Sequence, residues 1–423
     1  MRDLASVVTI DKVWALEGKD KVQGASFVEN GYEVMVGKEL QPGDLVAFIQ
    51  EGALLPADFD DKGEPCGTWA FLMRLKCYKS ELNRYLIKVK KFKEIKSWGL
   101  CLKLDEIGLT EKEISKLKAG DDLTELLHIE KYEPAEDASP TKSGATAKTP
   151  AWVKFCMKHF LTRWVGKIWF SSRKNQNAAG GFPTDIISKS DETTIQNYKM
   201  ALEKFKDSVV YTTCKMEGQS FTCLFELNKK GKPGNFYICS RNNAYKTKCG
   251  NDFWTAAKQY DIEQKLYDYY NKTGKQLVIQ GEQCGPGIQN NIYGFENFHW
   301  FVYAIKIQND GDRQVSIEEM KSICQELGLD TVPVIESNVR LGDIMPDLDS
   351  AVAYAEKRYW TPGNYFAEAN GKLWKNYLQH EGVVVRTIPF DKDKNIGCSF
   401  KVKNIDYAEK GLSEMAKIAA ALI

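Results

Sequence analysis

The feature of this sequence that most constrains its fold is a series of short apolar strands in the second half of the chain. Their lengths and their β-branched and aromatic residues are typical of strands bounded by turns. The expected strands lie at residues 209–213, 221–226, 235–239, 276–279, 299–305, 381–385 and 399–404. Helical spacing is expected at residues 195–205, at 253–270, after the cap at Ser316 and over the last twenty residues. The pattern predicts a mixed α+β domain.

Charged residues stand at the ends or on one face of these strands. Lys215 begins the tetrapeptide Lys215-x-x-Gly218 after the first strand, a pattern that alone is weak because it occurs three more times in the chain. Lys401 and Lys403 share one face of the last strand by its two-residue period, with apolar residues on the other face. Two neighbouring lysines repel each other, so we expect an anion such as a phosphate between them.

The first sixty residues have the pattern of a small β-barrel. The dipeptide Asn30-Gly31 separates two alternating segments and is a strong hairpin signal, because both residues adopt positive φ in a two-residue turn. A second turn signal, Pro42–Asp44, precedes a strand at residues 45–49. Short strands with closely spaced turns are typical of a barrel, and the OB type is one such barrel.

Two basic stretches flank a segment without apolar periodicity. Residues 74–96 hold nine basic and two acidic residues, which fits either a solvated face or a patch that contacts phosphates. Residues 133–150 are rich in Pro, Ala, Ser, Thr and Gly and are expected to form a flexible linker. Residues 152–183 mix six basic residues with aromatic ones, which suits either nucleic acid or packing between domains. We therefore expect domains at residues 1–132 and 151–423.

The composition excludes several classes of protein. The 58 basic and 57 acidic residues nearly cancel, which argues against a wholly basic nucleic-acid coat and against an acidic disordered chain. No apolar run approaches the about 18 residues of a membrane helix. Eleven cysteines without a Cys-x-x-Cys motif predict reduced thiols. We expect an intracellular protein, cytoplasmic by default, with no membrane partner. No feature of the sequence requires more than a monomer.

Five motifs, taken in order, resemble those of the covalent nucleotidyltransferases, the group of ATP-dependent ligases and capping guanylyltransferases. They are Lys215-x-x-Gly218, Ser240-Arg241-Asn242, Gly281-Glu282 with the run at residues 285–289, Glu381-Gly-Val-Val and Lys401-Val-Lys403-Asn. The run Gly-Pro-Gly-Ile-Gln and the last motif resemble RNA ligases specifically. Residues 10–56 resemble the N-terminal OB module of the fifth RNA ligase family, and residues 182–197 resemble its segment before the catalytic core.

The resemblance implies both a fold and a reaction. The fold is α+β, with an N-terminal OB-type β-barrel followed by an α+β nucleotidyltransferase domain that is ATP-grasp-like and built on antiparallel sheets. The reaction is ATP-dependent RNA ligation with Mg²⁺ or Mn²⁺. A lysine takes AMP from ATP, the AMP passes to an RNA 5′-phosphate, and a 3′-OH then closes the phosphodiester, at nicks in duplexes.

The resemblance also implies roles for the residues around the lysine. Lys215 is the nucleophile that carries AMP, and Gly218 belongs to the same nucleotide-binding motif. A free lysine is protonated at neutral pH, so Lys215 needs burial or a nearby cation to lower its pKa. Glu217, Glu282 and Glu381 are expected to hold the metal, largely through its waters, which Mg²⁺ retains readily.

Four further residues receive roles from the same motifs. Arg241 is expected to contact the nucleotide or the RNA end. Tyr303 stands where the family has an aromatic residue that stacks on adenine. Lys401 and Lys403 are expected to hold the α-phosphate as charge builds on it.

Two positions depart from the family pattern. The family has Phe-Asp in the aromatic strand where this chain has Tyr303-Ala304, which leaves that strand end differently supported. The family often has Arg where this chain has Thr194, so Thr194 cannot supply that phosphate contact, and a nearby lysine or the basic run up to Lys174 could substitute for it.

Two other functions fit parts of the sequence. One is a nucleic-acid-binding protein with an OB module and a degenerate nucleotidyltransferase core, and the intact lysine and three carboxylates weigh against it. The other is an ATP-dependent DNA ligase, and the absence of a large domain after Lys403 weighs against it. The OB module could bind nucleic acid, or could close over ATP and orient its pyrophosphate.

Overall fold

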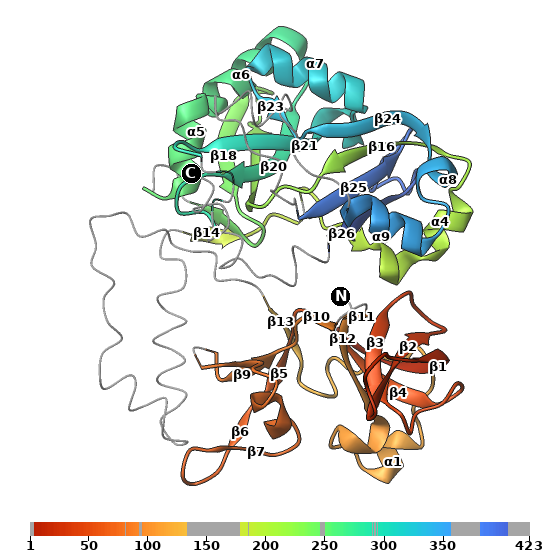
Figure 1. Ribbon diagram of the computed structural model, residues 1–423. Helices are drawn as coiled ribbons and strands as arrows, with labels where there is room; N and C mark the ends of the chain where they lie inside the picture. Colours follow the sequence, from red (N-terminus) through yellow and green to blue (C-terminus); the bar gives the residue numbers. More distant parts are fainter. Residues whose placement is uncertain are drawn as a thin grey trace.

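The computed structural model describes residues 4–80, 82–92, 95–132, 178–184, 186–245, 250–289, 291, 293, 295–356 and 381–404. They form an N-terminal part (residues 4–132) and a C-terminal part (residues 178–404), one below the other in Figure 1. The predicted linker, most of the segment at 152–183 and the predicted closing helix lie outside the described residues. None of the helices in the described ranges has the length and hydropathy needed to cross a bilayer.

The N-terminal part begins with a five-stranded antiparallel sheet that curls into a nearly closed barrel. Its strands, in spatial order, are β12 (Gly99–Lys103), β4 (Leu45–Gln50), β1 (Ala5–Ala15), β2 (Val22–Phe27) and β3 (Glu33–Gly37). The Trp98 amide next to β12 donates to the Glu33 carbonyl at 3.0 Å, so the two edges of the sheet approach each other. Phe27 and Phe48 pack inside with ring centroids 4.9 Å apart. The predicted barrel-like pattern is confirmed.

The hairpin predicted at Asn30-Gly31 exists, but its turn differs from the prediction. β2 pairs with β3 up to Ser26 and Glu33, and neither Asn30 nor Gly31 has positive φ. The connection is therefore longer than a two-residue turn. Gly31 is needed for a different reason, because a Cβ there would lie 2.4 Å from the Leu348 side chain of the C-terminal part.

Residues 53–98, between β4 and β12, form most of a second small sheet, which a later strand completes. Its strands, in spatial order, are β13 (Glu130–Lys131), β5 (Ala53–Pro56), β9 (Arg84–Leu86) and β8 (Tyr78–Lys79). Short elements flank the two sheets, namely β6 (Asp58–Phe59), β7 (Pro65–Cys66), η1 (Ala70–Met73), β10 (Lys90–Phe92), β11 (Ile95–Ser97), η2 (Leu104–Glu106) and α1 (Glu111–Ile114). Tyr85 and Leu72 are fully buried beneath this second sheet. The insertion thus packs on one side of the barrel and shares a hydrophobic core with it.

The C-terminal part is built on two larger sheets. The eight-stranded sheet contains β14 (Ala178–Gly181), β19 (Asn243–Tyr245), β18 (Pro233–Cys239), β17 (Gln219–Leu227), β20 (Leu277–Cys284), β21 (His299–Ile307), β22 (Arg313–Gln314) and β23 (Asp330–Thr331). The five-stranded sheet contains β15 (Thr193–Thr194), β26 (Ser399–Lys403), β25 (Gly382–Thr387), β16 (Val209–Cys214) and β24 (Val334–Arg340). Most neighbouring strands are antiparallel, which confirms a mixed α+β fold on antiparallel sheets.

Helices cover the outer faces of both sheets (Figure 1). The helical elements are η4 (Ile195–Tyr198), α4 (Met200–Lys204), α5 (Asp252–Tyr260), α6 (Ile262–Thr273), η5 (Gln308–Asp310), α7 (Ile317–Leu327), α8 (Leu341–Ile344) and α9 (Leu348–Glu356). The helix predicted at 253–270 is two helices, because Asp261 adopts φ 50° between them. The predicted cap at Ser316 is confirmed, since its side chain accepts a hydrogen bond from the Glu319 amide.

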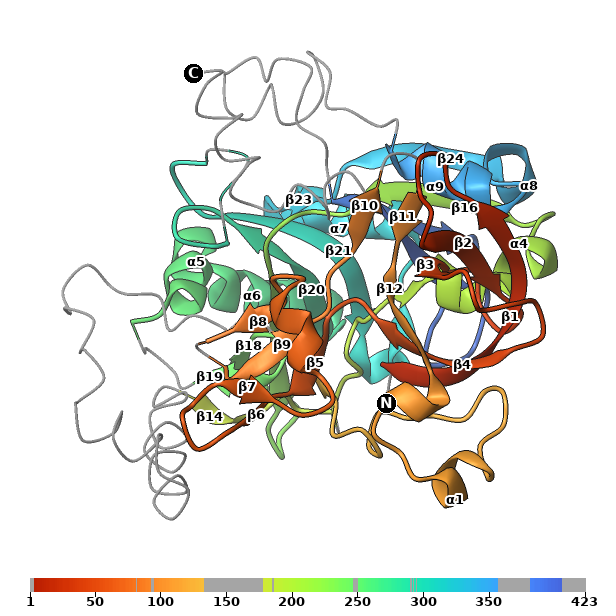
Figure 2. The same cartoon turned by 60° about the horizontal axis from the view of Figure 1, so that its bottom comes forward.

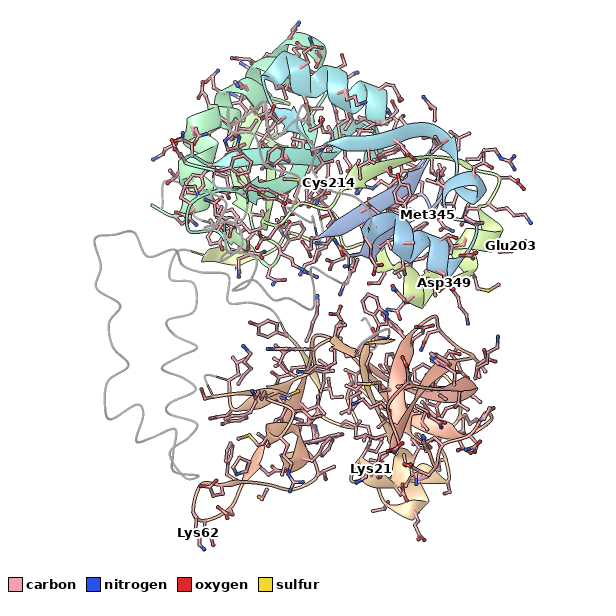
Figure 3. The ribbon with its side chains drawn as sticks, viewed as in Figure 1. Lys21, Lys62, Glu203, Cys214, Met345 and Asp349 are labelled. Carbon is pink, nitrogen blue, oxygen red and sulfur yellow. The ribbon has the colours of Figure 1, made fainter. Side chains whose placement is uncertain are left out.

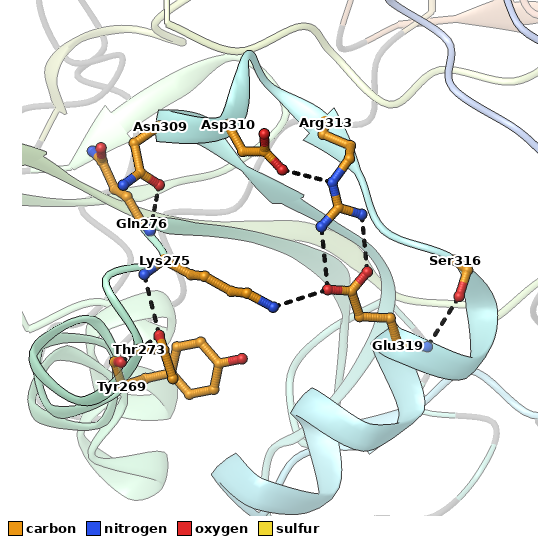
Figure 4. Close-up of polar contacts among 9 residues, drawn as sticks. All are labelled: Tyr269, Thr273, Lys275, Gln276, Asn309, Asp310, Arg313, Ser316 and Glu319. Atoms are coloured by element: carbon orange, nitrogen blue, oxygen red, sulfur yellow. Dashed lines mark hydrogen bonds and ion pairs between the residues drawn. The ribbon is translucent and has the colours of Figure 1, made fainter.

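A polar network ties α6 and α7 to the strands between them (Figure 4). Glu319 accepts two hydrogen bonds from Arg313, at 2.9 and 3.2 Å, and pairs with Lys275 at 3.2 Å. Arg313 also contacts Asp310 at 2.7 Å. Bidentate geometry makes such a pair stronger than an ordinary surface ion pair. The network therefore fixes α7 against the turn between β21 and β22.

The two parts contact each other through the barrel. Figure 1 shows the barrel below α9 and the five-stranded sheet, and the second small sheet below β14. In Figure 2 the N-terminal part lies in front of the C-terminal part. Lys199 donates to the carbonyls of Val28 and Asn30, at 2.8 and 3.2 Å. Figure 3 shows Asp349, next to Leu348, on the edge of the C-terminal part that faces the barrel. The hairpin loop is thus a docking element.

Candidate active site

Lys215 lies in the link between β16 and β17, where the two large sheets approach each other. Its amide donates to the Gly382 carbonyl at 2.9 Å, which holds the link against the start of β25. A Cβ at Gly218 would lie 2.5 Å from the Gln283 carbonyl oxygen and 2.8 Å from Glu282 Cγ. Glycine is therefore required at this position, because the link crosses β20 without room for a side chain. The close crossing brings Lys215 toward the residues of β20.

Two of the three predicted carboxylates lie near the Lys215 amine. Glu381, directly before β25, forms an ion pair with Lys215 Nζ. Glu282 projects from β20 toward the same amine and influences its charge. Burial alone would lower the pKa of Lys215, but the negative charges of Glu381 and Glu282 outweigh it, and the pKa is raised. The protonated amine is thus stabilised by its own neighbours.

The pKa of Glu282 is raised as well, which in a carboxyl favours the neutral form. Burial raises the pKa of its carboxyl to about 8, and Glu381 adds to this effect, while Lys215 and Arg241 oppose it. Carboxyls in such apolar sites hold a proton at neutral pH. Strongly shifted carboxyls gathered in a cleft are typical of functional sites.

These residues line a cavity of about 600 Å³ between the two large sheets. The five-stranded sheet contributes Lys215, Glu381 and Lys401, and the eight-stranded sheet contributes Glu282 and Tyr303 to its walls. The volume lies within the range of about 300–1,000 Å³ that is common for ligand pockets. The cavity can therefore hold a molecule of the size of a nucleotide.

Tyr303 lies in the wall at a β-bulge of β21. The register between β20 and β21 shifts from Gln280↔Ala304 to Gly281↔Val302, so Tyr303 is the extra residue. Bulges re-aim a side chain and occur often beside active sites. The Tyr303 hydroxyl shares hydrogen bonds with Ser190 at 2.6 Å and Ser220 at 3.4 Å, and burial raises its pKa to about 12. The ring is held by its hydroxyl at one edge of the cavity.

Arg386 supports this bulge and was not predicted from the sequence. Its side chain is almost fully buried, lines the cavity, and donates to the Tyr303 carbonyl. It also pairs with Glu192 at 2.7 Å. The contact to the Tyr303 carbonyl joins the two sheets beside the cavity. Ala304, which replaces the acidic residue of the family pattern, lies inside β21 and not at a strand end as expected, and Arg386 supports the residue before it.

Arg241 lies at a more exposed edge of the cavity. It pairs with Asp191 at 2.7 Å, and the neighbouring Lys189 donates to Asn242 at 2.8 Å. Burial would raise the pKa of Asp191, but Arg241, Lys131 and Lys401 overcome it and lower that pKa. Several positive charges therefore converge on this side of the cavity, as an anionic ligand requires.

The two lysines of β26 lie on one face of the strand, as predicted. Phe400, before the two lysines, and Val402, between them, are fully buried on the other face. Lys401 lines the cavity beside the buried Thr194, with which it is paired in register. Lys403 instead forms an ion pair with Glu51 of the N-terminal part. The two lysines therefore face different surroundings.

Glu217 lies apart from the other two carboxylates. It is 4 % exposed and is not among the residues that line the cavity. Its amide donates to the Tyr293 hydroxyl at 2.8 Å, and its carbonyl accepts from Cys284 Sγ at 3.2 Å. Burial raises the pKa of both Tyr293 and Cys284, and the nearby Glu217 carboxylate adds a smaller effect in the same direction. The structure thus brings Glu282 and Glu381, but not Glu217, to the cavity beside Lys215.

The cavity offers a limited set of ligands for a metal. Within the described ranges, no three or more His, Cys, Asp or Glu side chains are placed to bind one ion directly. Glu282 and Glu381 are the carboxylates beside Lys215, and their hard oxygens suit Mg²⁺ or Mn²⁺. Mg²⁺ keeps several waters when few protein ligands are available, so two carboxylates fit an ion held largely through water.

Comparisons with known proteins agree with this arrangement. The family model described as RNA ligase matches residues 208–403, from the start of β16 to the end of β26. No relative among the curated proteins matches the chain. Among solved structures, the chain is similar to Naegleria gruberi RNA ligase with ATP and Mn, with a TM-score of 0.70, 19% identity and 98% of each chain covered.

Two further structures of the same Naegleria protein are similar to this chain. The complex with AMP and Mn has a TM-score of 0.69 and 20% identity, over 98% of this chain and 100% of that one. The complex with PPi has a TM-score of 0.70 and 20% identity over the same shares. At this identity the likeness establishes the fold, and the family model adds the class of enzyme. The domain at residues 208–403 is therefore an RNA ligase domain, and the enzyme class predicted from the sequence is confirmed.

Proposed function

We propose that this protein is an ATP-dependent RNA ligase that carries AMP on Lys215. The observation that carries the proposal is the position of the Lys215 amine. It lies in a cavity of nucleotide size, against Glu381 and near Glu282, inside the region matched by the RNA ligase family. The Naegleria structures contain ATP, AMP and pyrophosphate, which are the species of a first adenylylation step.

In the first step Lys215 Nζ loses a proton and attacks the α-phosphorus of ATP. A P–N bond forms, the bond between the α-phosphorus and the bridging oxygen breaks, and pyrophosphate leaves with that oxygen. Glu282 and Glu381 would hold Mg²⁺ or Mn²⁺, which when bound would neutralise both carboxylates and the phosphate charge. Without these negative charges burial lowers the pKa of Lys215, which favours the nucleophilic amine.

The other cavity residues would bind the nucleotide. The ring of Tyr303 offers an aromatic face to adenine at the wall of the cavity. Lys401, on the opposite sheet, would hold the α-phosphate as negative charge builds on it. Arg241, at the more exposed edge, would contact the phosphates or the RNA end. Gly218 would allow the backbone of the lysine motif to approach the nucleotide.

The second and third steps would join RNA ends. An oxygen of the RNA 5′-phosphate attacks the lysyl-AMP phosphorus, which breaks the P–N bond and returns the amine. The 3′-OH of a neighbouring strand then attacks the activated 5′-phosphorus, and AMP leaves. We propose nicks in duplexes as the substrate, because a nick holds both ends beside a single cavity.

The domain organisation supports the same proposal. We propose that residues 1–132 form an OB-type module, since the nearly closed five-stranded barrel has the strand number of that fold. Residues 151–423 would form an ATP-grasp-like nucleotidyltransferase domain, joined through the linker at 133–150. Lys403 would reach the α-phosphate only by exchanging its Glu51 partner, and Glu217 would reach a metal only through water. The protein would act as a monomer.

Labelling with radioactive ATP tests the proposal. The full-length protein, incubated with α-labelled ATP and Mg²⁺ or Mn²⁺, is expected to become covalently labelled. The Lys215→Ala variant should lose the label, whereas Lys258→Ala, at an exposed lysine of α5, should keep it. Labelling of the Lys215→Ala variant at the normal level would contradict the assignment.

A panel of nicked duplexes tests the substrate. We expect sealing when the strand with the 3′-OH is RNA, and weaker sealing when it is DNA. Equal or better sealing of the DNA strand would instead identify a DNA ligase. RNA binding without any label transfer would identify a binding protein with an inactive core.

A further inference from the structure

We infer that the insertion at residues 53–98 carries an RNA-docking surface outside the catalytic cavity. The surface consists of the loop Met73–Lys76 together with Lys88 and Lys90, and its partner would be the RNA that flanks the ends being joined. The inference rests on the proposed function for the identity of the polyanion, but its geometry is independent of Lys215.

The loop presents four side chains in a row to solvent. Met73 and Leu75 are 40% and 47% exposed, and Arg74 and Lys76 are exposed between and beside them. The Lys76 amide donates to the Met73 carbonyl at 3.0 Å, and Lys76 adopts φ 55°, so the loop is a tight turn. Leu72 and Cys77 on either side are buried and anchor it. The loop is therefore a fixed projection.

Two lysines from the following segment lie beside this loop. Lys90 Nζ donates to the Leu75 carbonyl at 3.4 Å, which places its charge at the turn. Lys88 lies on the same side of the chain two residues earlier, and both lysines are exposed while Ile87 and Val89 are buried. Both lysines act on the buried Cys77 thiol, whose pKa burial raises and their charges partly lower. Four cations thus gather around two exposed apolar side chains.

The composition of this surface favours RNA over other partners. From residue 65 to residue 104 the sequence has two acidic residues, Glu81 and Glu94, so positive charge is weakly compensated. Of the eleven large apolar side chains exposed in the described part of the chain, four lie between residues 71 and 82. Cations bind phosphates with release of counterions, and apolar side chains pack on sugars and exposed bases. The combination fits a nucleic-acid strand that crosses the insertion.

The location is compatible with one RNA molecule reaching both sites. The insertion sheet ends at β13, whose next residue, Tyr132, lines the catalytic cavity. Figure 1 shows this sheet below β14, the edge strand of the eight-stranded sheet. RNA that extends from the cavity would reach the loop Met73–Lys76 by crossing this sheet from β13 to β8, the strand that follows the loop.

Binding of nicked RNA duplexes tests the inference, with either short or long double-stranded arms on the two sides of the nick. The charge variant Arg74→Gln/Lys76→Gln/Lys88→Gln/Lys90→Gln is expected to weaken binding of the long-arm duplex at least tenfold and to change the short-arm duplex little. The slope of the logarithm of the binding constant against the logarithm of the salt concentration should become shallower by up to about 0.9 per cation removed. A second variant, Met73→Ser/Leu75→Ser, should weaken long-arm binding without changing the salt slope.

Controls separate this inference from the proposed function and from misfolding. Lys116→Gln/Lys118→Gln removes exposed charge elsewhere in the N-terminal part and should leave long-arm binding unchanged. Lysyl-AMP formation, which uses no RNA, should remain at the wild-type level in all variants and reports that the site is folded. Unchanged long-arm binding by both surface variants would overturn the inference. The inference would also be overturned if the surface variants kept normal RNA binding but lost binding to anionic lipid vesicles. The same holds if they kept normal RNA binding but lost self-association.

Discussion

At the scale of single residues, Glu282 has a carboxyl that the fold stabilises in its neutral form. Its folded pKa of about 8 lies above the ordinary value of 4.5, so the native state holds a proton that the unfolded state releases. The stability that this proton gives is full below pH 4.5 and is lost as the pH rises toward 8. The slope in between is at most about 1.4 kcal/mol per pH unit.

Glu282→Gln is therefore expected to stabilise the metal-free protein, and increasingly so between pH 6 and pH 8. Thermal unfolding in EDTA across this range measures the effect. Glu296→Gln, which makes the same charge change at an exposed position, should show no such trend. A difference between Glu282→Gln and wild type that stays constant with pH would contradict the burial of an ionisable carboxyl here.

Gly218 lies where the site leaves no room for a side chain. In Gly218→Ala the new Cβ would meet backbone of β20 at 2.5 Å, so the lysine link must move. We expect lysyl-AMP formation to fall at least tenfold, because small displacements of reacting groups are costly. Gly180→Ala, where nothing lies within 4 Å of the new Cβ, is the matched control. Normal adenylylation by Gly218→Ala would show that the link has room to adjust.

Site residues were predictable where a charge stood at the end or on one face of a recognisable strand. Lys215, Glu282, Glu381 and Lys401 all meet this condition, and the structure gathers them in one cavity. The orientation of Glu217 was not predictable, because it depends on how the link crosses β20. Arg386 was missed because its partners, Glu192 and Tyr303, are far away in sequence.

At the scale of elements, the break between α5 and α6 rests on one residue. The periodicity of 253–270 continues through the break, so the sequence predicted one helix. Asp261 adopts φ 50°, a conformation that costs about 1 kcal/mol or more for a residue with a side chain. Strands were predicted more reliably, because their alternation and turns are local signals.

Asp261→Gly is expected to stabilise the protein by about 1 kcal/mol, because glycine adopts positive φ without strain. The backbone hydrogen bond from Lys265 to the carbonyl of residue 261 does not need a side chain and is retained. Chemical denaturation measures the change. Gly274→Ala, at φ 71° with open space around it, should shift stability in the opposite direction. A loss of stability in Asp261→Gly would indicate that its side chain stabilises the break.

At the scale of the whole molecule, the hairpin loop of the barrel determines how the two parts fit. The sequence predicted the hairpin from local signals, but its loop geometry is set by the C-terminal part. Gly31 donates its amide to the Gln196 carbonyl at 2.9 Å and lies against Leu348. No local pattern records such a contact between distant segments.

Gly31→Val is expected to separate the two parts while each remains folded, since its side chain would occupy the position of Leu348 Cδ2. Small-angle scattering should show a larger radius of gyration with unchanged circular dichroism. Leu348→Ala makes space on the other side, so the double variant should regain the compact form. Compact scattering by Gly31→Val alone would show that the interface absorbs the added side chain.

The ion pair between Lys403 and Glu51 would link the phosphate site proposed at Lys403 to the docking of a whole module. An anion that takes Lys403 releases Glu51 and so weakens the hold of the barrel. By thermodynamic reciprocity, the docked barrel weakens the affinity of Lys403 for that anion by the same factor. Occupancy of the proposed phosphate position and docking of the two parts would therefore be coupled equilibria, and a change in either would report on the other.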